Sequence, residues 1–236
     1  MNVIKRDGTA EPLNLDKIHQ MVEFACEDIT GVSSSQVEMN SGLQFFDGIE
    51  SEQIQNILIK SASDLISLDS PNYQFVAARL LLFSVRKQVF PEWNNTGYPK
   101  LKDHVNTCAE AGVYDGGILK KYDDEEWEEL NSYIDHQRCY GFTYAGLRQI
   151  VDKYLVQDRS TGSVYETPQY MYIMVAATLF QDYPKEKRLD YVKRYYTATS
   201  KGKINVPTPV LAGVRTPLRQ FASCVLVDVD DTLDSI

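Results

Sequence analysis

The chain has 236 residues, a net charge of −9 and a hydrophobic fraction of 43%, and this length is enough for one or two domains with a buried core. The negative charge argues against binding to nucleic acid or to anionic membranes through bulk electrostatics. No apolar run is long enough to span a bilayer and the N-terminus lacks a signal-peptide pattern, so we expect a cytoplasmic protein.

The N-terminus predicts a hairpin followed by a helix. Asp7-Gly8 lies between two short extended segments and is a strong signal for a tight turn. Asn14 or Asp16 is expected to cap the helix, because apolar residues then repeat at helical spacing. The repeat comprises Ile18, Met21, Val22, Ala25, Cys26 and Ile29.

Two further helices complete a small α+β unit. Ser51 is expected to cap the second helix, and the third runs from about Tyr73 to Lys87. The inner face of the second helix is expected to carry Ile54, Ile57, Leu58, Ala62 and Leu65. We assign residues 1–92 to this first domain, which has an ordinary domain size.

The middle of the chain is predicted to be mainly helical, after a turn-rich linker at residues 91–99. Four acids at 123–126 favour the first turn of a helix, where the helix dipole stabilises them. Pro168 is expected to start a long apolar helix, and residues 154–165 suggest a small hairpin. We assign residues 93–205 to a helical domain.

The last residues, 206–236, read as the opening of a third domain. Phe221 to Val229 is apolar and β-rich, which predicts a buried strand. Asp230, Asp231 and Thr232 then supply N-cap chemistry for a helix near Leu233. A buried strand without a following partner leaves an unpaired edge, so we expect the chain to work within a larger assembly.

Four cysteines are widely spaced, at Cys26, Cys108, Cys139 and Cys224. There is no CxxC pair and no paired cysteine–histidine set, so we expect neither zinc nor structural disulfides. The first three are interpreted as packing or surface residues, while Cys224 lies within the predicted strand and is considered separately below.

Basic residues from separated segments are candidates for holding a triphosphate. They are Lys5, Arg6, Lys17, Arg86 and Lys87. Arginine offers a bidentate fork and lysine a point charge, but there is no Walker or GxGxxG motif. Spacing alone favours scattered, solvated charges over a phosphate site.

A resemblance to a known family changes this balance. Lys5-Arg6-Asp7-Gly8, Glu11, Asn14, Lys17 and Asp47-Gly48-Ile49 with the helix after it resemble the ATP-cone, the regulatory nucleotide-binding domain found in many ribonucleotide reductases. Ile134-Asp135-His136, Lys153-Tyr154-Leu155-Val156, Thr161-Gly162, Tyr165-Glu166 and Tyr191-Val192-Lys193-Arg194 look like the helical region of the class I large subunit. Pro207-Thr208-Pro209, Gly213-Val214-Arg215-Thr216-Pro217 and Gln220-Phe221-Ala222-Ser223-Cys224-Val225-Leu226 look like the first strand of its catalytic barrel.

The matches run in order along nearly all of the chain, so the whole resembles the N-terminal portion of a class I (Ia-type) large (alpha) subunit. The implied fold is mainly α with a small β component: an α+β ATP-cone, a helical domain, and the first strand of a ten-stranded α/β barrel. The implied activity is reduction of ribonucleoside diphosphates to deoxyribonucleoside diphosphates, in a complex and not by this chain alone.

In such cones, ATP or dATP sets the overall activity. The resemblance implies that Lys5, Arg6 and Lys87 hold phosphates and that Glu11 and Asn14 read the adenine. The implied nucleotide site comprises Lys5, Arg6, Glu11, Pro12, Leu13, Asn14, Leu15, Asp16, Lys17, Ser51, Gln55 and Lys87.

Two positions depart from the family pattern. Gln55 and Ser84 stand where cones that respond to dATP often carry histidine. Losing two imidazole contacts weakens the hold on phosphate, so we expect a cone that binds nucleotide weakly or lacks inhibition by dATP.

In the barrel, the resemblance implies that Cys224 is one of two thiols that reduce the ribose 2′ position. Oxidation of the two thiols to a disulfide supplies the two electrons. The resemblance places Thr208 and Ser223 at the substrate, with Thr208 near the diphosphate. It also assigns Asp231, Thr232 and Leu233 to part of the specificity site, where a deoxynucleoside triphosphate selects the substrate.

The resemblance also implies partners and cofactors. The effectors are ATP, dATP and deoxynucleoside triphosphates, with Mg²⁺ accompanying the nucleotide. No metal cofactor is expected in this chain, because the metal-radical cofactor belongs to the small (beta) subunit. The other partners are the C-terminal portion of the large subunit, expected downstream of Ile236 with the radical cysteine, and thioredoxin or glutaredoxin.

Two alternatives stay open. The chain could be a non-catalytic nucleotide sensor, in which a cone on a helical module binds ATP and a partner protein. A sensor does not need the substrate-facing set of Thr208, Ser223 and Cys224. A fragment of a class III reductase is the other alternative, although the collinear start of the barrel fits class I better.

Overall fold

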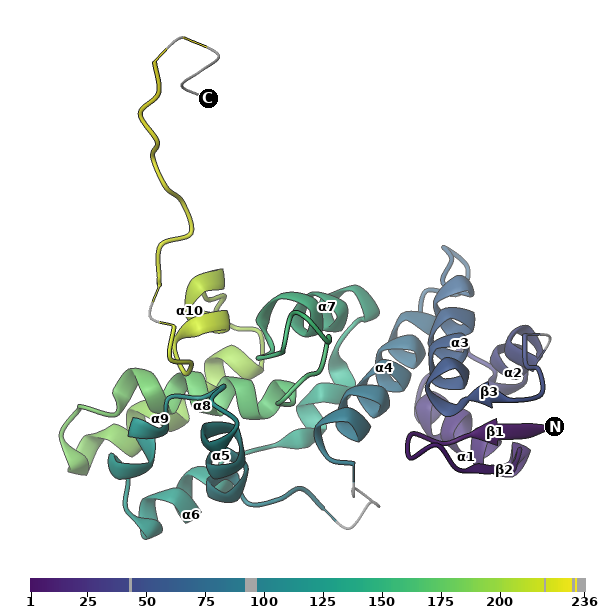
Figure 1. The fold of residues 1–236 in the computed structure, drawn as a ribbon, viewed down its shortest axis with the longest axis horizontal. Helices are drawn as coiled ribbons and strands as arrows, with labels where there is room; N and C mark the ends of the chain where they lie inside the picture. The colour runs from purple at the N-terminus through teal and green to yellow at the C-terminus, as the bar shows by residue number, and fades with distance from the viewer. Residues whose placement is uncertain (43, 92–96, 219, 231, 233–236) are drawn as a thin grey trace.

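The computed structural model describes residues 1–42, 44–91, 97–218, 220–230 and 232. Within these residues the chain is mainly helical, with one small sheet at its N-terminal end (Figure 1). None of the helices in these ranges is both long and apolar enough to cross a membrane.

The sheet has three short strands in the order β2-β1-β3. They are β1 (Asn2–Ile4), β2 (Ala10–Pro12) and β3 (Ile49–Glu50). The predicted hairpin is confirmed, because β1 and β2 pair antiparallel around a turn in which Gly8 has φ 82°. The Asp7 carboxylate accepts a 2.9 Å hydrogen bond from the Thr9 amide and so shapes this turn. Strand β3, parallel to β1, was not predicted.

Four helices pack beside the sheet. They are α1 (Leu15–Cys26), α2 (Ser34–Gly42), α3 (Ser51–Asp64) and α4 (Tyr73–Val89). Asn14, not Asp16, caps α1, because its side chain accepts a 3.1 Å hydrogen bond from the Lys17 amide. Predicting Ser51 as the cap of α3 was wrong: Glu50 precedes the helix, and its amide donates to Gln53 Oε1 at 3.1 Å. Helix α2 was not predicted, since only Val37 and Ser41 of it are buried and its sequence has no apolar period.

The region beyond residue 100 is helical, as predicted. It contains α5 (Leu101–Glu110), η1 (Gly116–Lys120), α6 (Asp124–Ser132), η2 (His136–Gly141), α7 (Tyr144–Gln149), η3 (Ile150–Tyr154), α8 (Pro168–Phe180), α9 (Lys185–Ser200) and α10 (Thr208–Gly213). The acidic run does begin a helix, because Asp123 and Glu126 form a reciprocal capping box. The predicted hairpin at 154–165 is reduced to a single antiparallel bridge, Gln157 with Val164.

The core has two hydrophobic clusters. The first continues from the N-terminal unit into the helical region, because α4 packs against α7 and η2; Leu80 and Leu147 both belong to it. The second lies between α5, α6, α8 and α9 and is built around Trp127, Tyr170 and Tyr196. The two regions therefore share buried surface instead of meeting through a linker alone.

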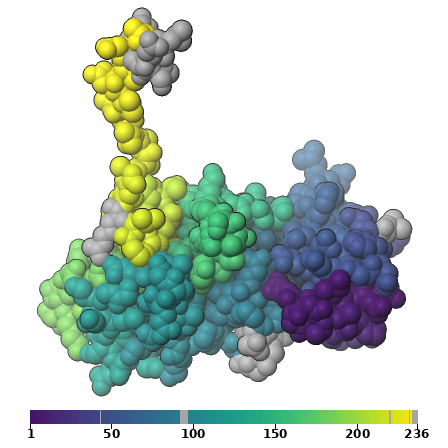
Figure 2. Space-filling view, viewed as in Figure 1, coloured from purple at the N-terminus to yellow at the C-terminus, as the bar shows by residue number. Residues whose placement is uncertain are grey.

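The C-terminal segment differs from the prediction. Phe221 to Val229 is neither a strand nor buried: residues 220–230 run away from α10 with exposed side chains (Figures 1 and 2). A strand needs a hydrogen-bonded neighbour, and the described part of this chain does not pair with residues 220–230. Assignment of this segment to a barrel stays a prediction.

Candidate functional site

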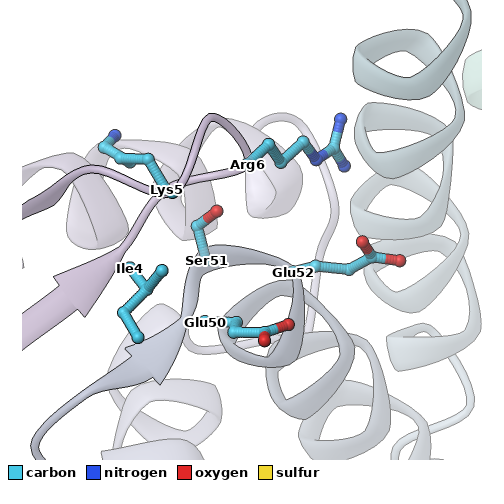
Figure 3. A pocket seen from close by; sticks show the side chains of 7 residues that line it. Ile4, Lys5, Arg6, Glu50, Ser51 and Glu52 are labelled. Atoms are coloured by element: carbon cyan, nitrogen blue, oxygen red, sulfur yellow. The ribbon is translucent and has the colours of Figure 1, made fainter.

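An open pocket of about 310 Å³ lies between the β1–β2 turn and the start of α3. It is lined by Ile4, Lys5, Arg6, Gly8, Glu50, Ser51 and Glu52. Figure 3 shows Lys5 and Arg6 extending in opposite directions from the turn, with the Ser51 hydroxyl between them. Ser51 is the first residue of α3, where backbone N–H groups have no helical partner and favour an anionic ligand.

Beside the pocket, Glu11 of β2 joins two of the predicted cations. Lys5 Nζ lies 2.9 Å and Lys17 Nζ 3.9 Å from Glu11 Oε1. The hydrogen bond from Lys5 holds the pKa of Glu11 below its usual value, and the charges of Lys5 and Lys17 act in the same direction. Glu11 is therefore ionised at neutral pH and keeps both ammonium groups near the hairpin.

Arg6 and Lys87 connect the hairpin to the end of α4. The Arg6 guanidinium donates a 2.9 Å hydrogen bond to the Lys87 carbonyl oxygen, and Lys87 Nζ donates to the Pro91 carbonyl oxygen. Both side chains are exposed. Lys5, Arg6 and Lys87, from two segments more than eighty positions apart, thus lie at one end of the N-terminal unit.

Arg86 does not join this group. Its side chain is only 2% exposed and points into the core, where it donates a 2.9 Å hydrogen bond to Tyr140 Oη. Its guanidinium also lies over the rings of Tyr98 and Tyr140, at 5.4 and 5.1 Å from their centroids. Including Arg86 among the candidate phosphate-binding cations was therefore wrong.

The two departures from the family pattern have different surroundings. Gln55, on α3, donates from its side-chain amide to the Leu80 carbonyl oxygen at 2.8 Å. Ser84, on α4, is buried. The Gln55 amide nitrogen is thus used to join α3 to α4.

The other residues predicted to line the nucleotide follow the chain from β2 into α1. Pro12 ends β2, Asn14 is the N-cap, and Leu15, Asp16 and Lys17 form the first turn of α1. Leu13 is half-buried against the core, whereas Leu15 is 63% exposed. They follow Glu11 directly along the chain, and their contact with a nucleotide stays a prediction.

Four pocket residues were missed by sequence reasoning, namely Ile4, Gly8, Glu50 and Glu52. Glu50 and Glu52 flank Ser51, so the expected helix start was a signal that could have found them. Gly8 belongs to the turn motif itself. None of the described residues forms a group of three or more histidine, cysteine, aspartate or glutamate side chains that could hold a metal ion.

The second set of candidates is not assembled in this structure. Thr208 begins α10 and is exposed, while Ser223 and Cys224 lie on the exposed segment, with Ser223 Oγ 3.7 Å from Cys224 Sγ. Thr232 is exposed as well, and Asp231 and Leu233 lie outside the described residues.

The cysteines separate clearly by environment. Cys108 and Cys139 are buried, and burial raises the pKa of these thiols to about 12 and about 11. Cys26 packs against the core, and burial raises its pKa to about 11. Because the thiolate is the reactive form, these three are poor nucleophiles at neutral pH, and Cys224 is the exposed thiol among the four.

Known proteins are similar to this chain along its whole length. Residues 1–88 match the ATP cone domain family, and residues 140–219 match the ribonucleotide reductase, all-alpha domain family. Over 234 residues, 99% of the chain, it is 52% identical to the ribonucleoside-diphosphate reductase subunit alpha of Haemophilus influenzae and 50% identical to ribonucleoside-diphosphate reductase 1 subunit alpha of Escherichia coli. It is 41% identical over 238 residues to the subunit alpha of Enterobacteria phage T4. The chain spans only 31%, 30% and 31% of the lengths of these three relatives.

Proposed function

Because this chain belongs to the ribonucleotide reductase family, with an ATP-cone followed by the all-alpha domain, we propose that it is the N-terminal part of an alpha subunit that reduces ribonucleoside diphosphates. Its own task is to bind the effector nucleotide and to supply one edge of the catalytic unit. The remaining parts of the alpha subunit and a radical-generating small subunit complete the enzyme.

The observation that carries the proposal is that Lys5 and Arg6 line a pocket that contains the Ser51 hydroxyl, and that Arg6 is hydrogen-bonded to the backbone of Lys87 at the end of α4. Charged donors from separated segments suit the phosphates of ATP or dATP, since hydrogen bonds between ionised partners are the strongest available. Glu11 and Asn14 lie on the adjoining edge and are the proposed contacts for adenine. Such a site does not require a Walker motif, because the proposed phosphate contacts are charged side chains and not a glycine-rich loop.

Mg²⁺ accompanying the nucleotide fits the lining of the pocket. Glu50 and Glu52 would repel a bare triphosphate, and Mg²⁺ commonly binds one or two carboxylates together with substrate phosphates. These two carboxylates would hold the ion at the phosphate end of the pocket.

The response to dATP is proposed to be weak. The Gln55 amide nitrogen already bonds the α4 backbone, and a serine hydroxyl at Ser84 cannot carry a positive charge. Neither side chain replaces the grip of a protonated imidazole on phosphate. The proposed result is a cone that binds nucleotide weakly or lacks inhibition by dATP.

For the reaction itself, Cys224 is proposed as one thiol of the reducing pair, with Thr208 and Ser223 contacting substrate. Asp231, Thr232 and Leu233 are the proposed part of the specificity site, and residues 206–236 the start of the catalytic barrel. Reduced thioredoxin or glutaredoxin would restore the thiols after each turnover.

The test is to assemble the complete alpha subunit containing this chain with its small subunit and to measure CDP reduction. We expect activity that ATP stimulates, that dATP does not fully inhibit, and that Cys224→Ser abolishes. The matched control is Cys108→Ser, which alters a buried thiol outside the proposed chemistry and should retain turnover. A chain that binds ATP while the complete assembly fails to reduce CDP would favour the nucleotide-sensor function instead, and full inhibition by dATP would refute the role given to Gln55 and Ser84.

A further inference from the structure

A fully buried ion pair joins α10 to the helical region. Glu166, two residues before α8, and Arg215, two residues after α10, both have completely buried side chains. Arg215 Nε donates to Glu166 Oε2 at 2.8 Å, and Nη2 donates to Oε1 of the same carboxylate. This is the bidentate fork geometry that arginine favours.

Both side chains of the pair also form hydrogen bonds to other parts of the chain. Glu166 accepts hydrogen bonds from the Tyr114 hydroxyl and, at 2.6 Å, from the Val156 amide. The Arg215 guanidinium donates to the carbonyl oxygen of Leu211 and, at 2.9 Å, to that of Tyr154. The network is therefore satisfied inside the protein, which is the condition under which buried charges are tolerated.

The bonds of this network come from four separate stretches of the chain. They are the residues before η1, the end of η3 with Val156, the start of α8, and α10 itself. The amide of Asp115 adds a 2.9 Å bond to the Arg215 carbonyl oxygen. Helix α10 lies against η3 and α8 (Figure 1), so its position is fixed from several directions at once.

Stability alone does not account for this arrangement. Burying two charges carries a desolvation penalty that their attraction often only balances, and apolar residues of similar volume can be equally stable. What a bidentate, fully bonded pair adds is a defined orientation. Here the oriented element is α10, whose first residue is Thr208.

We propose that Glu166 and Arg215 are positioning residues for substrate binding: they hold α10 in the orientation that presents Thr208 to the diphosphate of the substrate. This inference rests on the proposed function of Thr208. It assigns to the pair an effect on the Michaelis constant for the nucleoside diphosphate, although neither side chain touches substrate.

The test uses the complete reductase with Glu166→Gln and Arg215→Gln introduced together. The two changes remove both charges together, so an unpaired buried charge is not left behind. Glutamine matches glutamate in size, but it is shorter than arginine and offers two N–H donors in place of five. The matched control is Glu126→Gln with Arg188→Gln. That pair is also nearly buried, with side chains 5% and 11% exposed, but it joins α6 to α9 and has no bond to α10.

We expect the Glu166/Arg215 variant to lose about tenfold to a hundredfold in kcat/KM for CDP, mostly through a higher KM, because small misplacements of binding groups have effects of this size. ATP binding to the cone should be unchanged, and the control variant should keep the KM of the parent enzyme. Equal KM values in the two double variants and the parent, or equal losses in both double variants, would overturn the proposal.

A milder variant covers the case in which the double variant does not fold. Tyr114→Phe removes one donor to Glu166 while keeping the buried ring, and it should raise the KM for CDP roughly two- to fivefold, as expected for loss of one hydrogen bond. An unchanged KM in this variant would also overturn the inference. Inactivity of the parent enzyme would instead contradict the proposed function, so the two failures are distinguishable.

Discussion

Arg6→Ala is expected to weaken ATP binding by an amount that the structure allows us to work out. Its guanidinium donates to the Lys87 carbonyl oxygen at 2.9 Å on an exposed surface. A bound phosphate must compete with this neutral acceptor. The net effect of Arg6 is therefore the difference between a hydrogen bond in which both partners are ionised and one in which the guanidinium alone is ionised.

A hydrogen bond that involves a charged group contributes about 1.5–3 kcal/mol. The guanidinium–phosphate bond, with both partners ionised, belongs at the upper end of this range, and the guanidinium–carbonyl bond at the lower end. The difference is about 1–1.5 kcal/mol, which corresponds to a roughly five- to thirteenfold higher Kd for ATP in Arg6→Ala. Isothermal titration calorimetry at physiological ionic strength measures this directly. At higher salt the difference should shrink, because the site is exposed.

Arg159→Ala is the matched control. Arg159 is also exposed and also donates to a backbone carbonyl, that of Asp152, at 3.0 Å, but it is not among the residues that line the pocket. Its loss should leave the Kd for ATP unchanged. An unchanged Kd in Arg6→Ala, or the same change in both variants, would refute the placement of phosphate at Arg6.

Two further predictions concern the fold. Leu80→Ala removes a fully buried side chain from α4 and should lower the free energy of unfolding by about 2–5 kcal/mol in urea denaturation. The control, Leu68→Ala at a fully exposed position, should change this free energy by less than about 0.5 kcal/mol. Equal effects of the two substitutions would contradict the assigned core. Burial lowers the pKa of His104 from 6.5 to about 4, so the native state resists its protonation and stability should fall as the pH drops from about 6.5 toward 4. His104→Phe should lose less stability than the parent between pH 7 and pH 4.5, and an identical loss would show that His104 does not contribute.

Local signals were enough to predict much of the N-terminal unit. The Asp7-Gly8 turn, the Asn14 cap and the apolar stripe of α1 depend on neighbours within a few residues, and the structure contains all three. The prediction that the acidic run begins a helix, α6, was confirmed for the same reason. Where spacing within one segment decides the outcome, sequence reasoning is reliable.

The failures involve contacts between distant segments. The orientation of Arg86 depends on Tyr98 and Tyr140, which no local pattern around residue 86 reveals. Strand β3 exists only because β1, more than forty positions earlier, pairs with it. The apolar run at Phe221–Val229 has the composition of a strand but no hydrogen-bonding neighbour among the described residues, and composition cannot supply one.

The core shared by α4, α7 and η2 has a consequence for how such proteins gain or lose parts. A gene that lost the codons for residues 1–92 in one step would uncover Leu147 and Cys139, which belong to the same buried cluster. The shortened protein would expose an apolar surface that favours aggregation. Losing the N-terminal unit therefore requires polar replacements on α7 and η2 in the same lineage, and acquiring one requires the reverse, so this unit is not freely interchangeable between proteins.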